Sequence, residues 1–110
     1  MNLKIISLDS FGNDVKRLYK KYKQIPKDLK ALQRTLEKDP RSGIALGNSC
    51  YKIRLENSSV PTGKSGGFRI VYYYIDKENH LYLMVMYSKT ELENISDEKI
   101  LEILKSHDLV

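Results

Sequence analysis

The stretch GKSGGFRIVYYYI, residues 63–75, joins a glycine-rich, cationic loop to a run of β-branched and aromatic residues. Such a run is typical of a β-strand, and Arg69 lies near its start. A nucleotide-binding P-loop also contains Gly-Lys-Ser, but it requires a glycine five residues earlier and a helix immediately afterwards. The earlier position is Ser58, and the residues after the loop favour a strand. The sequence therefore argues against a P-loop.

Two further strands are expected beside this one. Residues 50–56 alternate between apolar and charged side chains, as a half-buried strand does. The apolar face comprises Tyr51, Ile53 and Leu55, and the charged face comprises Lys52, Arg54 and Glu56. Residues 76–79 are typical of a hairpin turn, and residues 80–89 predict a second apolar strand. We expect the three strands to form an antiparallel meander.

The other periodic segments predict a short strand and three helices. Residues 3–8 favour a strand, and a helix capped by Asp9 or Ser10 follows to about residue 22. Pro26 suits the first turn of a second helix that ends at Asp39, and residues 41–49 are interpreted as a loop. Ser96 is expected to cap a last helix. Its buried side chains are expected to be Ile100, Leu101, Ile103 and Leu104.

These elements predict one α/β domain of the α+β type over residues 1–110, in the order β-α-α-β-β-β-α. A chain of 110 residues is long enough for one modest core. We expect a small antiparallel sheet with two N-terminal helices and a C-terminal helix. Helices should cover one face of the sheet and leave the other face bare.

Composition and charge narrow the classes of partner. No apolar run approaches the roughly 18 residues of a membrane span, and the N-terminus lacks a signal peptide, so a cytoplasmic protein is expected. The single cysteine, Cys50, cannot form an internal disulfide or a multi-cysteine metal site. Residues 1–54 carry 13 Lys or Arg against 5 Asp or Glu, net +8, whereas residues 55–110 carry 6 against 9, net −3. The basic half favours a polyanionic partner, although a solvated lysine-rich surface has the same composition.

The alternation of the strands predicts a cationic face. Lys52 and Arg54 share one face of their strand, and Arg69 joins them if the usual register holds. Tyr87 and Lys89 share a face near the end of the next strand. Burying unpaired cations is costly, so this face is expected to be open and able to bind a phosphodiester.

Three sequence blocks in this order resemble the RelE/HigB-type toxins of bacterial type II toxin–antitoxin systems, in the RelE/ParE superfamily. They are YKIRL at 51–55, GKSGGFRIVYY at 63–73, and YSK at 87–89 with ISDE at 95–98. The glycine block points to the HigB-like branch. The resemblance implies a ribosome-dependent mRNA endonuclease, or mRNA interferase, that inhibits translation and is neutralised by a cognate antitoxin protein. It also implies catalysis by Lys, Arg and Tyr through attack of the RNA 2′-hydroxyl, with no metal and no cofactor.

The resemblance suggests roles for six residues. Arg54 and Arg69 are assigned to stabilising charge on the phosphate, because arginine stays protonated and is a poor base. Lys52 or Lys64 is the candidate general base, and Lys89 matches a basic position after the last strand. Tyr87 is a candidate for donating a proton or stacking on a base, or it is a core aromatic. The catalytic tyrosine of the RelE type lies after this strand, where this chain has none.

The same residues are compatible with structural roles and with two other functions. Arg69 would be structural if it formed a salt bridge with Glu56 or Glu91, and Lys64 would be a solvated loop residue. A ParE-like toxin that inhibits DNA gyrase without catalysis would share the fold, but proteins of that type tend to lack the basic face. A nucleic-acid-binding module without catalysis is compatible with the charge alone.

Overall fold

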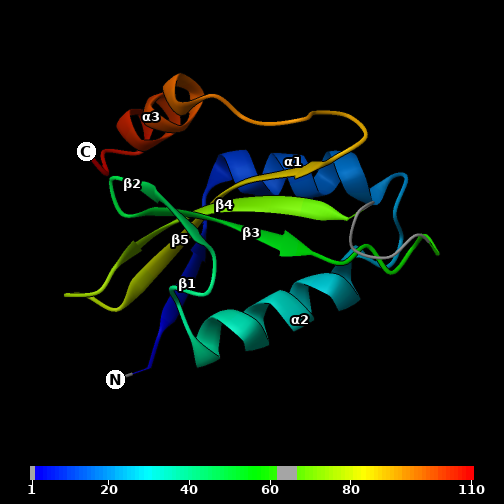
Figure 1. The fold of residues 1–110 in the computed structure, drawn as a ribbon, viewed down its shortest axis with the longest axis horizontal. Helices are drawn as coiled ribbons and strands as arrows, with labels where there is room; N and C mark the ends of the chain where they lie inside the picture. The colour runs from blue at the N-terminus through cyan, green and yellow to red at the C-terminus, as the bar shows by residue number, and fades with distance from the viewer. Residues whose placement is uncertain (1, 62–66) are drawn as a thin grey trace.

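A five-stranded sheet forms the centre of the computed structural model, which describes residues 2–61 and 67–110. Its strands lie in the order β1-β5-β4-β3-β2 (Figure 1). The elements along the chain are β1 (Lys4–Ser7), α1 (Asp9–Tyr19), α2 (Ile25–Lys38), β2 (Ile44–Gly47), β3 (Cys50–Leu55), β4 (Phe68–Ile75), β5 (His80–Ser88) and α3 (Asp97–Ser106). The α+β class and the antiparallel meander β3-β4-β5 are confirmed, and β1 pairs with β5 in parallel. None of the helices in these residues is long and apolar enough to cross a membrane.

The helices α1 and α2 cover one face of the sheet. Pro26 lies in the first turn of α2 and Asp39 follows its last residue, as predicted. Side chains of both helices meet the sheet in one cluster, which includes Phe11, Leu18, Leu32, Leu36, Phe68, Ile70, Tyr72 and Leu83. Burial of this apolar surface fixes the position of β4, since every second residue of that strand belongs to the cluster.

The prediction that the opposite face is bare was wrong, because α3 packs on part of it. Figure 1 shows α3 and α2 on opposite sides of the sheet. The α3 cluster includes Val71, Val85, Tyr87, Ile100, Ile103 and Leu104. Ser96 caps α3 as expected, since its hydroxyl accepts the backbone N–H of Lys99 at 3.1 Å. Leu101 was expected in the core but is 40% exposed.

The interpretation of residues 41–49 as a loop was also wrong, because they contain β2, an edge strand paired with β3. A tight connection makes this pairing possible: Gly47, Asn48 and Ser49 all have positive φ, a conformation that glycine and asparagine tolerate best. Ahead of β2, a Cβ atom on Gly43 would lie 2.8 Å from the carbonyl oxygen of Lys52. Glycine at position 43 therefore lets this segment approach β3 closely.

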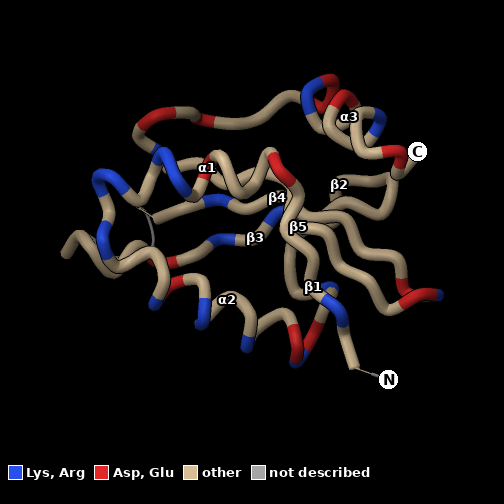
Figure 2. The backbone as a smooth tube through the Cα atoms, turned by 180° about the vertical axis from the view of Figure 1, so that it is seen from behind, with Lys and Arg blue, Asp and Glu red and all other residues tan. Residues whose placement is uncertain are grey.

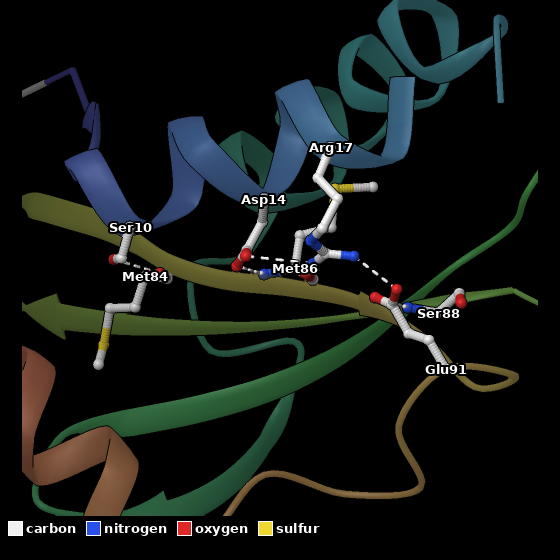
Figure 3. A network of polar contacts seen from close by, with 7 residues as sticks. All are labelled: Ser10, Asp14, Arg17, Met84, Met86, Ser88 and Glu91. Carbon is white, nitrogen blue, oxygen red and sulfur yellow. Dashed lines mark hydrogen bonds and ion pairs between the residues drawn. The ribbon is translucent and has the colours of Figure 1, made fainter. Parts of the chain in front are cut away.

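Side chains of α1 replace a neighbouring strand along the last half of β5. Among the described strands, β1 pairs with β5 only as far as Leu83. Beyond that residue, Ser10 donates to the carbonyl of Met84 at 2.6 Å, and Asp14 accepts the backbone N–H of Met86 at 3.0 Å (Figure 3). The register between β4 and β5 shifts here, since Val71 pairs with Val85 but Tyr72 pairs with Leu83. This bulge at Met84 turns the end of β5 so that Tyr87 faces α3, opposite to the face of Leu83.

Candidate cationic active site

A row of polar side chains crosses three adjacent strands on the face that α3 partly covers. Arg54 of β3 pairs directly with Arg69 of β4, which in turn pairs with Tyr87 of β5. Directly paired residues point to the same face of a sheet. Lys52 lies two residues before Arg54 and therefore shares that face. The predicted convergence of Lys52, Arg54 and Arg69 on one face is confirmed.

A cleft of about 370 Å³ opens beside this row. Four cationic residues contribute to its wall: Lys52, Arg54, Arg69 and Lys89. The cleft is also lined by Ile53 of β3 and by the segment before and at the start of β2, residues Ser42, Gly43 and Ile44. Figure 2 shows Lys and Arg positions side by side on β3 and β4. The cleft therefore gathers positive charge from three separate parts of the sequence.

Arg69 is a buried cation that faces another cation. Its side chain was expected to be exposed but is only 5% exposed, and its Nη1 donates to the carbonyl of Phe68 at 3.2 Å. Burial lowers the pKa of the Arg69 guanidinium, and the nearby Arg54 lowers it further. Within residues 2–61 and 67–110 no ion pair joins Arg69 to a carboxylate, and Glu91, one suggested partner, pairs with Arg17 instead. A buried charge in this setting is destabilising unless an anion accompanies it.

Tyr87 combines a buried ring with a hydroxyl at the edge of the site. The residue is 2% exposed and packs in the α3 cluster. This burial leaves no ring face on which a base could stack, so that suggested role is contradicted. Burial raises the pKa of the Tyr87 hydroxyl, and the positive charge of Arg69 acts in the opposite direction. Its hydroxyl lies 3.5 Å from Oδ1 of Asn94, to which it donates.

Asn94 is a site residue that the sequence did not reveal. Its Oδ1 also accepts a hydrogen bond from Nζ of Lys52 at 3.1 Å, so Asn94 contacts Lys52 and Tyr87 at once. An asparagine two residues before a helix cap has an ordinary role as a turn residue, which gave no reason to select it. Only its hydrogen bonds with Lys52 and Tyr87 in the folded chain identify it.

The remaining predicted residues lie at the border of the site or outside the description. Lys89 follows the last residue of β5, and its Nζ donates to the carbonyl of Glu93 at 3.5 Å. Lys64 lies outside the described residues. Cys50 is buried at 2% exposure, and burial raises the pKa of its thiol to about 11, so it is a small core residue rather than a nucleophile.

The chemistry available in the cleft is that of anion binding. The Lys and Arg donors that line it can hold a phosphodiester and stabilise charge that develops on it. In the described part of the chain, no group of three His, Cys, Asp or Glu side chains is arranged to hold a metal ion. The candidate active site therefore comprises the row of Arg54, Arg69 and Tyr87 together with Lys52, Lys89 and Asn94.

Solved structures with the same fold are toxins and a toxin–antitoxin complex. The free form of an arginine-to-alanine double mutant of the E. coli toxin RelE matches with a TM-score of 0.58 and 22% identity, covering 84% of this chain and 90% of RelE. The P21 crystal form of isolated E. coli RelE matches with a TM-score of 0.55 and 20% identity, covering 94% of this chain and 97% of RelE. A chain of the intact E. coli RelBE toxin–antitoxin complex matches with a TM-score of 0.54 and 22% identity, covering 76% and 93%. No protein-family model matches the sequence. This chain has the fold of the E. coli toxin RelE.

Proposed function

We propose that this chain is the toxin of a type II toxin–antitoxin pair and that it cleaves mRNA on the ribosome. The observation that carries the proposal is the row of Arg54, Arg69 and Tyr87 beside a cleft to which Lys52 and Lys89 also contribute. The RelE fold supports the same reading. Arg69 is buried and has no carboxylate partner within residues 2–61 and 67–110, an arrangement that is costly for folding and is typical of a cation that binds an anion.

The proposed reaction is a transesterification within the RNA strand, in which a 2′ oxygen replaces the 5′ oxygen on the adjacent phosphorus. A base, Lys52 or Lys64, takes the proton of a 2′-hydroxyl, and the resulting oxygen attacks the adjacent phosphorus. The bond from phosphorus to the 5′ oxygen breaks, and that oxygen takes a proton, for which the Tyr87 hydroxyl is the candidate donor. Arg54 and Arg69 stabilise the extra negative charge on the phosphate during the transfer. The products carry a 2′,3′-cyclic phosphate and a 5′-hydroxyl.

Ribosome dependence and an antitoxin partner are further parts of this proposal. The net charge of +8 on residues 1–54 suits a site lined by ribosomal RNA, which would also hold the mRNA in a reactive shape. RelE occurs in an intact complex with an antitoxin, and we propose a cognate antitoxin for this chain as well. The glycine block at residues 63–67 supports placing the toxin in the HigB-like branch.

A cell-free translation assay with mapping of mRNA 5′ ends tests the proposal. Purified protein added to translating ribosomes should stop synthesis and leave mRNA fragments with 5′-hydroxyl ends. The same mRNA without ribosomes should remain intact. Arrest of DNA supercoiling by gyrase with uncut mRNA would instead support a ParE-like toxin. Binding of mRNA without cleavage or arrest would support a non-catalytic module.

A further inference from the structure

Asn94 lies where two strands of the candidate site meet the connector between β5 and α3, residues 89–96. Its Oδ1 accepts from Nζ of Lys52 at 3.1 Å and from the hydroxyl of Tyr87 at 3.5 Å. Lys52 belongs to β3 and Tyr87 to β5, and the strand β4 separates them in the sheet. One amide oxygen therefore contacts two groups that come from non-adjacent strands.

The connector that carries Asn94 is anchored on α1 by Glu91. One oxygen of the Glu91 carboxylate accepts the backbone N–H of Ser88 at 3.2 Å, and the other pairs with the guanidinium of Arg17 (Figure 3). Arg17 also contacts the carbonyl of Met86 at 3.5 Å, on the strand that carries Tyr87. Backbone bonds from Glu91 and Leu92 to the carbonyl of Ser88, both 3.2 Å, close a turn at this point.

The C-terminal end of the connector is held by α3. Ser96 caps that helix, and Ile95 packs against the α3 cluster. Asn94 itself is exposed, so it lies on the solvent side of a segment that is fixed at both ends. This arrangement places the amide reproducibly beside Lys52 and Tyr87.

The side-chain amide of Asn94 has N–H donors that are not used within the described residues. Its oxygen is used twice, whereas its Nδ2 has no hydrogen-bond partner among the described residues. An asparagine amide carries two N–H donors, and the natural acceptor beside Lys52, Arg54 and Arg69 is an oxygen of a bound phosphate. Because its oxygen accepts from a lysine and a tyrosine of the candidate site, the N–H groups of Asn94 lie beside the same site.

We infer that Asn94 is a further substrate-positioning residue: its oxygen orients Lys52 and Tyr87, and its N–H groups donate to a phosphate oxygen of the bound nucleotide. The assignment to RNA rests on the proposed function. The contact with a nucleotide phosphate is a property of the site that can be measured without cleavage.

The test uses the intact ¹⁵N-labelled protein titrated with adenosine 3′-monophosphate and followed by NMR. The side-chain NH₂ signals of Asn94 are identified by their loss in Asn94→Asp. They should shift during the titration with the same dissociation constant as the backbone signals of Arg54 and Arg69. Asn94→Ala should bind the nucleotide about 10-fold more weakly or worse, as expected for a lost hydrogen bond to a charged group. The neighbouring exposed residue provides the matched control: Glu93→Ala should leave the dissociation constant unchanged or slightly tighter.

Asn94→Asp separates the two parts of the inference. A carboxylate at position 94 still accepts from Lys52 and Tyr87, but it cannot donate and it repels phosphate. Binding as tight as in the wild type would overturn the donor role and leave Asn94 a structural contact. Absence of any shift at Asn94, while Arg69 responds or while no signal responds, would overturn the inference entirely. A wild-type protein that binds the nucleotide through Asn94 but never cuts mRNA in the translation assay would refute the proposed function and not this inference.

Discussion

Replacing the buried Arg69 with methionine should stabilise the fold and abolish activity. Arg69 is 5% exposed, it lies directly opposite Arg54, and burial lowers its pKa because the charge is poorly solvated. Like charges paired directly across strands are destabilising, and an apolar side chain of similar length removes the cost of burying the charge as well. We expect the free energy of unfolding of Arg69→Met to rise by about 1 kcal/mol, or about 4 °C in Tm for a domain of this size. Cleavage of mRNA should fall by about 10²–10³, the usual effect of removing a charge-stabilising donor.

Chemical denaturation and the translation assay measure the two effects. Arg54→Met is the matched control, because it relieves the same repulsion from an exposed position and should change stability less. Inorganic phosphate adds a second comparison. It should raise the Tm of the wild type more than that of either variant, since general salt effects are common to all three. A loss of 1 kcal/mol or more in Arg69→Met would show that Arg69 stabilises the fold, and the reasoning from an unpaired buried charge would be refuted.

Four further predictions concern the reaction, Cys50 in the core and the antitoxin partner. Cleavage should continue after chelation of free metal ions, provided that the ribosomes stay assembled, and mapped products should carry 5′-hydroxyls; 5′-phosphates would indicate attack by an activated water instead. The thiol of Cys50 should react with a disulfide reagent about 100-fold more slowly in the native than in the unfolded protein at pH 8, because a pKa near 11 instead of 9.0 reduces the thiolate by that factor. Equal reactivity in both states would refute the burial of Cys50. The same pKa shift predicts that the free energy of unfolding falls as pH rises from 9.0 towards 11, because mainly the unfolded state loses the thiol proton in that range. Cys50→Ala should lessen this fall. Association with the cognate antitoxin should slow with added salt if the basic half steers it, and an association rate independent of salt would exclude steering.

Local sequence was sufficient for the elements whose signals lie within a few residues. The strand Phe68–Ile75 follows from an unbroken β-branched and aromatic run between a glycine-rich loop and a polar turn. The cationic face follows from alternation, because the apolar set of β3 must meet the core and this leaves Lys52 and Arg54 on the other side. Caps and breakers also act locally, as Ser96 and Pro26 do.

Tertiary structure decided which face Tyr87 takes, because this depends on a bulge in β5 and not on local sequence. The bulge at Met84 places Tyr87 on the face that carries Arg54 and Arg69. Simple alternation from Leu83 would put Tyr87 on the opposite face, which α1 and α2 cover. That bulge accompanies contacts from Ser10 and Asp14, which lie 74 and 72 residues from their partners on β5.

The burial of Arg69 and the place of Asn94 were likewise undetermined by sequence. Arg69 is only 5% exposed, although it lies on a face that alternation predicts to be open and on part of which α3 packs. Asn94 reaches Lys52 across 42 residues of sequence only because Glu91 and Ser96 fix the connector that carries it. Periodicity reports which face a side chain takes, whereas the neighbours that cover that face come from distant segments and are set by packing.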